Sequence, residues 1–369
     1  MVQNYFFVSL ISIYNLRETD IIVGVRAVES IKGIHSVTFR EAYMKSVCFL
    51  CPPYVETGGT ECIFECAATL KAMGVDATVA LTTRLKNGHL TYLNDGNGVP
   101  QRFRRYPVSL TVPDVDFDGL VVFPETLVNS IPLTRFRNVG VWWLSVDNAF
   151  LSIELRKNIF LMGEQLRHNI RVHQTACSRS VVHLVQSRYA YEFCKKHFGI
   201  PLYLRDSVTA SGLNNCDRDV SIAYNPRRGS QYVAPVIDML SSSYKCVPII
   251  GLQHFEVLDL LSRSKVCIDF GHQPGRDKLP REAGLAGCVV LLGRRGAASN
   301  EFDFPVGHRY KVDLDSPNYL NDSINLVEDI FKFYDDHLLN QKHFRDIVRN
   351  ATSEHKSDCL QLISSISSI

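Results

Sequence analysis

The segment His272–Gly296, HQPGRDKLPREAGLAGCVVLLGRRG, decides how this chain is interpreted. Together with Gly271 it holds six glycines and, counting His272, six cationic side chains around an apolar run at 288–293. A solvated surface would mix its charges, and a core element would avoid them. Basic side chains on glycine-rich turns beside a buried strand indicate a place where backbone N–H groups and cations meet an anion.

Basic turns follow three predicted strands in this half of the chain. The strands are VSIAY (220–224), KVCIDF (265–270) and CVVLLG (288–293). In an open parallel sheet, ligands bind at the carboxyl ends of the strands, where helix N-termini also attract negative charge. The sequence therefore predicts a diphosphate site at this edge. Its predicted ligands are Arg228, Arg276, Lys278 and the backbone of Gly293–Gly296, whereas Arg294 and Arg295 could equally be exposed loop charges.

The first half of the chain shows one sharp strand-loop-helix-strand unit. The apolar run at 46–54 ends in two prolines, and the pair Gly58-Gly59 then opens a predicted helix over 61–73. Apolar residues recur at helical spacing in that helix, and Gly74 follows it at the position favoured for a C-cap. The pattern of strands alternating with helices continues along the chain and requires parallel sheets. With 369 residues, we predict two successive α/β units divided near residue 205.

Taken together, these motifs resemble glycosyltransferases of the GT-B architecture, in which two Rossmann-like domains face each other across a cleft. The turn Asn225–Gly229 resembles the basic turn of the donor domain, and Glu56–Glu61 resembles the glycine-rich loop at the cleft. The run WWLSVDN (142–148) is similar to one in bacterial polysaccharide-biosynthesis glycosyltransferases. The later donor segment is matched by Pro280, Glu282, Ala283, Gly287 and Gly293. The resemblance covers residues 46–345.

The resemblance implies that a hexosyl or deoxyhexosyl group moves from a nucleoside-diphosphate sugar to a hydroxyl of a glycan or glycolipid. It implies an acceptor-side domain at 1–204, a donor-binding domain at 205–345 and a helical tail at 346–369. Glu282 is expected to accept hydrogen bonds from the ribose hydroxyls, although a first-turn carboxylate also suits the helix dipole. The predicted donor-binding residues are Gly58, Gly59, Asn225, Arg228, His272, Gly275, Arg276, Lys278, Arg281, Glu282, Gly293, Arg294 and Gly296.

The stereochemical outcome of the transfer is left open by the sequence. Retaining relatives carry a second glutamate ahead of the Glu-Ala pair, and Pro274 stands at that position here. An inverting enzyme needs a carboxylate in the first domain to deprotonate the acceptor. Asp147 and Glu61 are the candidates. Asp147 could instead be a helix N-cap, and Glu61 could be a first-turn partner of the helix dipole.

Two alternative functions are compatible with the sequence: a metal-dependent transferase and a non-catalytic binding protein. Asp114–Asp118 and Asp313–Asp315 contain Asp-x-Asp pairs, which could hold a divalent cation and make the enzyme metal-dependent. However, the first pair precedes its strand, at the opposite edge of the sheet from the basic turns. The protein could also be a non-catalytic module that binds nucleotide sugars. The favoured reading needs no metal and no other cofactor.

Cysteines and tryptophans suggest further sites that we interpret as core. Cys48, Cys51, Cys62 and Cys66 have roughly the spacing of a zinc site, but strand alternation turns the first two in different directions. Trp142 and Trp143 likewise point to opposite faces, so both are expected in the core. The eleven cysteines are expected to be free thiols of a reducing compartment.

The charge and hydropathy of the sequence limit which nucleic acids and membranes the protein is expected to contact. A net charge of +2 gives no basic excess of the kind that nucleic-acid binders show. The apolar run Phe6–Tyr14 is too short to span a bilayer. We therefore predict a cytoplasmic protein that binds no nucleic acid and makes at most a peripheral membrane contact.

Overall fold

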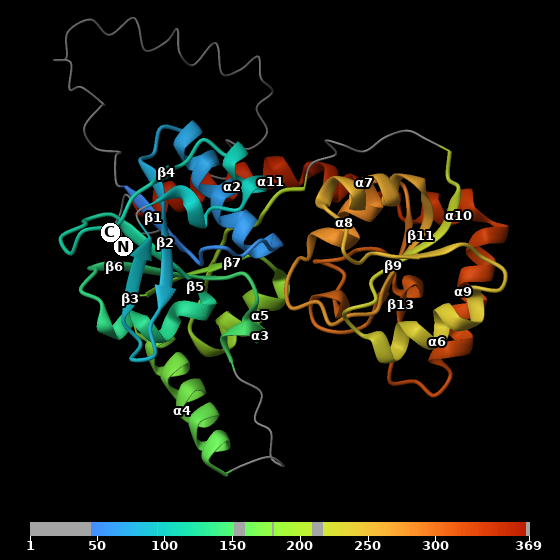
Figure 1. Cartoon of the computed structure of the whole chain (residues 1–369), viewed down its shortest axis with the longest axis horizontal. Helices are drawn as coiled ribbons and strands as arrows, with labels where there is room; N and C mark the ends of the chain where they lie inside the picture. The colour runs from blue at the N-terminus through green and yellow to red at the C-terminus, as the bar shows by residue number, and fades with distance from the viewer. Residues whose placement is uncertain (1–45, 94, 151–158, 179–180, 209–216, 367–369) are drawn as a thin grey trace, which may run out of the picture. The chain divides into compact units, whose positions relative to one another are not determined.

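The computed structural model describes residues 46–93, 95–150, 159–178, 181–208 and 217–366. All of them lie within one compact unit, Met44–Ile369. They form two sheets with helices on both faces (Figure 1). The sheet of the first lobe has the strand order β3-β2-β1-β5-β6-β7-β8, with β4 paired to β2, and the sheet of the second lobe has the order β10-β9-β11-β12-β13. The α/β fold predicted from the alternation of strands and helices is confirmed.

Every strand pair of the first sheet is parallel except the edge pair of β2 and β3. Its strands are β1 (Val47–Cys51), β2 (Ala77–Arg84), β3 (Leu90–Leu93), β4 (Ser109–Leu110), β5 (Leu120–Pro124), β6 (Asn138–Trp143), β7 (Val181–Val185) and β8 (Leu202–Tyr203). The helices of this lobe are α2 (Gly58–Ala72), α3 (Val146–Ala149), α4 (Ile159–Ala176) and α5 (Arg188–His197), with 3₁₀ turns at Gly96–Gly98, Gln101–Arg105 and Glu125–Leu133.

The strand pairs of the second sheet are all parallel. Its strands are β9 (Val220–Tyr224), β10 (Cys246–Pro248), β11 (Ser264–Asp269), β12 (Val289–Gly293) and β13 (Lys311–Val312). The helices after β9 are α6 (Ser230–Leu240), α7 (His254–Arg263), α8 (Lys278–Leu285), α9 (Tyr319–Lys332), α10 (Tyr334–Asn340) and α11 (Lys342–Ile366), with 3₁₀ turns at Ala297–Ser299 and His308–Tyr310. The division predicted near residue 205 stays a prediction; β8 and β9, on either side of it, belong to different sheets.

The central strands are apolar throughout because helices cover both faces of each sheet. Every residue of β1, β5 and β12 is buried. Trp142 packs into the core on one face of the first sheet and Trp143 into the core on the other. Cys48 likewise faces away from Cys51, Cys62 and Cys66, which share the Trp142 face. Strand alternation therefore separates Cys48 from the other three cysteines of the zinc-like spacing, and it places both tryptophans in the core as predicted.

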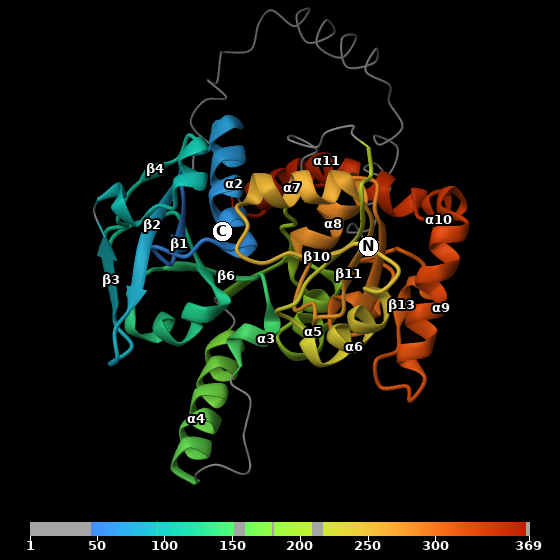
Figure 2. The ribbon, with the colours of Figure 1, turned by 45° about the vertical axis from the view of Figure 1, so that its right-hand side comes forward.

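Helix α11 belongs to both lobes. Phe344 and Val348 near its start pack in the core of the second sheet, whereas Cys359, Leu362 and Ile366 pack in the core of the first. Along its length it contacts α8 of the second lobe and α2 of the first (Figure 2). The segment 346–369, predicted as a tail, is thus largely one helix with an apolar face buried against both sheets.

No helix in the described part of the chain is both long enough and apolar enough to cross a membrane. The run Phe6–Tyr14, the one membrane-contact candidate from the sequence, lies outside the described residues.

Candidate functional site

The carboxyl ends of both sheets line one cavity of about 310 Å³, which we call the cleft cavity. The first lobe contributes the N-terminus of α2 and the residues after β5, β6 and β7, including Glu125, Ser145, Asn148 and Gln186. The second lobe contributes Arg228, after β9, and Pro274–Lys278, after β11. Ligands of open α/β sheets bind at such strand ends. The predicted donor residues that line this cavity are Gly58, Gly59, Arg228, Gly275, Arg276 and Lys278.

The first wall of the cleft cavity is the N-terminus of α2. Thr57 caps the helix through a reciprocal pair: its hydroxyl accepts from Thr60 N at 3.3 Å, and Thr60 Oγ1 accepts from Thr57 N at 3.0 Å. Gly58 and Gly59 then form the first turn, where N–H groups have no partner within the helix. Since both glycines line the cavity, their N–H groups and the helix dipole favour an anion there.

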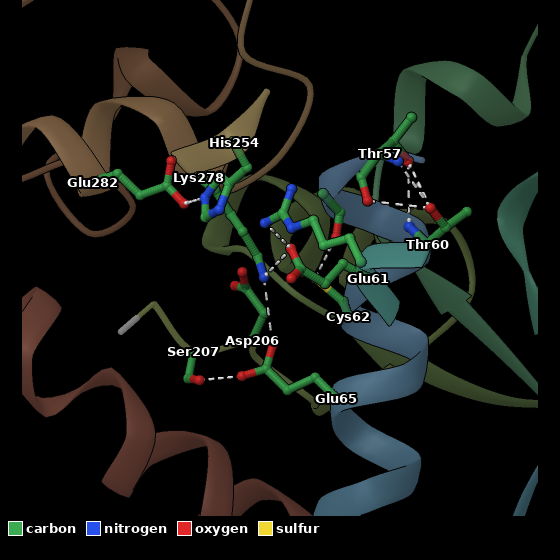
Figure 3. A network of polar contacts seen from close by, with 12 residues as sticks. Thr57, Thr60, Glu61, Cys62, Glu65, Asp206, Ser207, His254, Lys278 and Glu282 are labelled. Atoms are coloured by element: carbon green, nitrogen blue, oxygen red, sulfur yellow. Dashed lines mark hydrogen bonds and ion pairs between the residues drawn. The ribbon is translucent and has the colours of Figure 1, made fainter. Parts of the chain in front are cut away.

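The second wall supplies the cations. Arg228, Arg276 and Lys278 come from two different turns and line the same cavity. Lys278 Nζ lies 3.0 Å from Glu61 Oε2 and 3.6 Å from Glu65 Oε2, so this lysine reaches from the second lobe to α2 (Figure 3). Arg228 donates to Asp277 Oδ2 at 2.6 Å, and its side chain is about half exposed, at 48%. An anion bound here would meet three basic side chains, two of which, Arg228 and Lys278, are already paired with carboxylates.

Glu61 is almost completely buried beneath this wall. Arg102 Nη2 and Arg105 Nη2 lie 2.7 and 2.5 Å from its carboxylate, and Lys278 is the third cation. Burial opposes ionisation, but Lys278 and Arg102 outweigh it and lower the pKa of Glu61 below its ordinary value. A carboxylate held by three cations accepts a proton poorly. Its role as the base stays a prediction, and its contacts position Lys278.

The predicted base Asp147 and the predicted donor residue His272 contact each other directly. His272 Nε2 lies 2.7 Å from Asp147 Oδ2, and Tyr189 Oη donates to Asp147 Oδ1 at 3.1 Å. Asp147 lies in the first turn of α3, whose N-cap is Ser145, so the N-cap reading of Asp147 is wrong. The side chains of Asp147 and His272 are 38% and 48% exposed.

Glu282 does not line the cleft cavity. Its Oε1 lies 2.8 Å from His254 Nε2, and it lines a second cavity together with Glu61, Phe255 and Lys278. Lys278 lines both cavities and is the side chain between them. Figure 3 shows His254 and Glu282 pointing toward each other on the far side of Lys278 from Thr57. The predicted contact of Glu282 with a ribose stays a prediction.

The remaining predicted donor residues have other partners in this conformation. Arg281 has no exposed surface and donates to Asp206 Oδ2 at 2.6 Å. Asn225 donates to Asp269 Oδ2 at 3.4 Å, and Arg294 lies 3.9 Å from Asp313 and lines a separate cavity. A side chain at Gly293 or Gly296 would overlap Leu314 or the backbone of Gln273. These glycines allow neighbouring turns to pack closely, and their contact with a donor stays a prediction.

The Asp-x-Asp pairs lie outside the cleft cavity. Asp114–Asp118 precede β5, so they lie at the opposite end of that strand from Glu125. Asp313 and Asp315 are ion-paired with Arg294 and Arg295. The geometry therefore does not favour a metal-dependent site at either pair.

Glu125 is the cavity residue that the sequence reasoning missed. It follows Pro124 at the carboxyl end of β5, is 5% exposed and lines the cleft cavity. No described residue donates a hydrogen bond to its Oε2. Burial raises its pKa to about 7, although the backbone N–H groups of Glu125 and Leu144 oppose the shift. The available signal was a carboxylate directly after an apolar strand, at the same sheet edge as the basic turns.

Gly275 is required for close contact between the two walls. A Cβ at this position would overlap the carbonyl oxygen of Leu144. Gly275→Ala is therefore expected to destabilise the protein by about 1–3 kcal/mol, the usual cost of overpacking. Urea unfolding checks this, with Gly163→Ala as the matched control, because a Cβ at Gly163 in α4 meets nothing and its φ is not left-handed. Equal losses of unfolding free energy in the two variants would show that overlap with Leu144 is not the cause.

The comparisons with known proteins agree with this fold. No protein-family model matches the chain, and no curated protein matches its sequence. Among the solved structures with a similar fold is sucrose-phosphate synthase from Thermosynechococcus elongatus, which is 10% identical, with a TM-score of 0.58 over 86% of this chain and 97% of that one. Another is WaaG, a glycosyltransferase involved in lipopolysaccharide biosynthesis. It is 12% identical, with a TM-score of 0.56 over 87% of this chain and 99% of that one. The chain has the GT-B fold of two Rossmann-like domains that the sequence resemblance implied.

Proposed function

We propose that this protein is a glycosyltransferase that moves a hexosyl or deoxyhexosyl group from a nucleoside-diphosphate sugar to a hydroxyl of a glycan or glycolipid. The observation that supports it best is the make-up of the cleft cavity. The N-terminus of α2 and three cations from the second lobe form an anion site, and a buried carboxyl group, Glu125, lines the same space. The fold, shared with sucrose-phosphate synthase and WaaG, is compatible with this function.

The diphosphate is the group that this anion site suits. Gly58 and Gly59, at the start of α2 where N–H groups have no partner within the helix, line one wall, and Arg228, Arg276 and Lys278 line the other. When the bond between the sugar and the diphosphate breaks, negative charge grows on the leaving oxygen. Cations and backbone dipoles already in place stabilise that charge without rearrangement. We propose that this step uses no metal, with Arg228, Arg276 and Lys278 as the cations that stabilise the leaving group.

Glu125 is the group that we propose as the general base of an inverting transfer. The acceptor oxygen forms a bond to the anomeric carbon as the bond to the diphosphate breaks, and the acceptor proton passes to the Glu125 carboxylate. A base whose pKa lies near neutral pH is suited to that task. Asp147 is the rival base, since it lies in α3, directly after Ser145 and Val146, near the cavity wall.

The second cavity is the proposed site of the nucleoside. Lys278 lines both cavities, so a diphosphate at Lys278 would direct its nucleoside toward Glu282 and its sugar toward Glu125. The carboxylate of Glu282 can accept from ribose hydroxyls on this side. We further propose a cytoplasmic protein with no nucleic-acid partner and at most a peripheral contact with a membrane that carries the acceptor.

Thermal stabilisation by nucleotides tests the donor site. UDP, GDP, dTDP, ADP and CMP would each be added with and without Mn²⁺. A nucleotide at a hundred times its Kd adds about 2.7 kcal/mol of stability, which gives a clear shift in Tm. Metal-independent stabilisation by one diphosphate, followed by turnover of its sugar conjugate, supports the proposal. Stabilisation without turnover of any such conjugate would favour a binding module, and a strict Mn²⁺ requirement would favour a metal-dependent enzyme.

Arg228→Ala is expected to weaken binding of that nucleoside diphosphate by about 10- to 150-fold. A hydrogen bond to a charged group contributes about 1.5–3 kcal/mol, and Arg228 lines the cavity with its side chain about half exposed. Isothermal titration calorimetry measures the change. Arg294→Ala is the matched control, because this predicted donor cation lines a different cavity. A larger loss in the control than in Arg228→Ala would place the diphosphate elsewhere.

A further inference from the structure

Three side chains with soft donor atoms meet in the core behind the cleft cavity. Cys66 lies on α2, and His355 and Cys359 lie one turn apart on α11. Their exposed fractions are 0%, 2% and 0%. The sulfurs of Cys66 and Cys359 are 3.9 Å apart, and His355 Nε2 lies 3.8 Å from Cys359 Sγ. One ligand atom from each residue lies within 4.8 Å of the other two.

These separations are close to those around a tetrahedral zinc ion. Zn–S bonds of about 2.3 Å and Zn–N bonds of about 2.0–2.1 Å place two sulfurs about 3.8 Å apart, and a sulfur and a nitrogen about 3.6 Å apart. The observed 3.9 and 3.8 Å differ from these values by tenths of an ångström. The third pair of donors, from Cys66 and His355, lies within 4.8 Å, so rotation of these side chains would bring the three donors onto one ion.

The imidazole of His355 is already oriented as a zinc ligand. Its Nδ1 lies 2.5 Å from the backbone oxygen of Arg205, an acceptor that fixes the hydrogen on Nδ1. Nε2 therefore faces Cys359. Histidine ligands of metals almost always donate their other ring N–H to a carbonyl or carboxylate in this way. The acceptor is itself held in place, because Asp358 Oδ2 accepts from Arg205 N at 2.9 Å and from Arg205 Nε at 2.8 Å.

An oxygen lies beside the same ring nitrogen, Nε2, that approaches Cys359. Thr69 Oγ1 is 3.0 Å from His355 Nε2, and its hydrogen is donated to the backbone oxygen of Glu65 at 2.9 Å. The lone pairs of this hydroxyl therefore face the cluster. We propose that Cys66, His355 and Cys359 bind one Zn²⁺, with Thr69 Oγ1 on its fourth side. Two thiolates and an imidazole are ligands that zinc favours.

The proposed zinc would tie α11 to the helix that forms the anion site. Cys66 lies two turns after Gly58 and Gly59 on α2, and α11 connects the cores of both lobes. Such an ion would be structural, because its ligands are buried and do not line the cleft cavity. This role is independent of the proposed transfer reaction. It is also distinct from the cysteine spacing in the sequence, of which only Cys66 takes part.

Metal analysis of the reduced full-length protein tests the proposal. The protein would be incubated with one equivalent of Zn²⁺, dialysed and measured by mass spectrometry of its metals. About one zinc per chain is expected. Cys66→Ser and Cys359→Ser should each lower zinc affinity by at least tenfold, since removing even an outer-sphere partner costs about 10–100-fold. Cys194→Ser is the matched control, because that buried cysteine lies in a different core and should keep its zinc.

Cobalt substitution keeps the test decisive if a serine variant folds poorly. Co²⁺ added to the wild type should give a thiolate-to-metal charge-transfer band, which Cys194→Ser keeps and His355→Gln weakens. Zinc well below one equivalent with no such band would overturn the proposal. So would a Cys66–Cys359 disulfide in the protein as purified, detected by alkylation and peptide mass mapping, because it would show that the sulfurs pair with each other.

Discussion

Glu125→Gln is expected to lower kcat for sugar transfer by about 100- to 10,000-fold, the usual contribution of a general base. The substitution keeps the shape of a side chain that is 5% exposed but removes its ability to accept the acceptor proton. Binding of the nucleoside diphosphate should change little, because that group is held by the second wall and by α2. The measurement is kcat and KM for the donor identified by nucleotide stabilisation.

The same substitution should raise stability at neutral to alkaline pH. Burial raises the pKa of Glu125 from 4.5 to about 7, so the folded state holds a proton that the unfolded state releases. The contribution of the protonated Glu125 carboxyl group to the free energy of unfolding is complete below about pH 4.5 and is lost as the pH rises through about 7. The difference between the pKa values of the unfolded and the folded state corresponds to about 3 kcal/mol in the free energy of unfolding. Urea unfolding from pH 5 to pH 8 should show the wild type losing stability relative to Glu125→Gln.

Asp147→Asn separates the two candidate bases. It removes a carboxylate that is 38% exposed and paired with His272, so a moderate effect on activity is expected. A large loss of kcat in Asp147→Asn with an active Glu125→Gln would assign the base to Asp147.

If the stability of Glu125→Gln follows the wild type at every pH, then Glu125 is not protonated in the folded state at neutral pH.

Asp206→Ala is expected to destabilise the protein by about 3–5 kcal/mol, because it leaves Arg281 charged and buried without its partner. Neither side chain of this pair is exposed, and Arg281 Nη2 lies 2.6 Å from Asp206 Oδ2. Burial opposes ionisation of Asp206, but Arg281 and Lys278 outweigh it and lower its pKa to about 2. Arg281 also donates to the backbone oxygens of Arg276 and Asp277, so the loss should reach the turn that lines the cleft cavity.

The double variant Asp206→Leu/Arg281→Met distinguishes a missing partner from a general loss of packing. Replacing a buried ion pair by apolar residues of similar size is often neutral or stabilising, so most of the stability should return. Urea unfolding measures both variants. Asp219→Ala is the exposed control, because Asp219 pairs with Lys245 and Arg263 at the surface. This variant should lose much less free energy of unfolding than Asp206→Ala. A double variant less stable than Asp206→Ala would contradict the explanation.

Local sequence patterns were sufficient to predict the fold and six of the residues that line the cleft cavity. Apolar runs such as 47–51 and 289–293 can only be strands covered on both faces, and the turns that follow parallel strands must meet at one edge. Arg228, Gly275, Arg276 and Lys278 line one cavity for that reason, since they follow β9 and β11 of one parallel sheet, and Gly58 and Gly59 line it from the first lobe. The helix after Gly58-Gly59 was also predictable, because its apolar residues recur at helical spacing; the structure begins it at Gly58, three residues before the predicted start, and ends it at Ala72.

Only the tertiary structure decided which of the charged residues are free to meet a ligand. Arg281 resembles its neighbours Arg276 and Lys278 in the sequence, but Asp206, 75 positions away, binds it in the core. Glu125 became notable only once burial and its place beside the cations were known.

The cluster of Cys66, His355 and Cys359 shows the same limit over a longer distance. Cys66 and Cys359 are 293 positions apart, and they meet because the apolar face of α11 packs into the cores of both lobes. Strand and helix patterns are properties of neighbouring residues and can be read from the chain. The partner of a buried charge or thiol is set by how whole elements pack, and the sequence by itself does not contain that information in any local form.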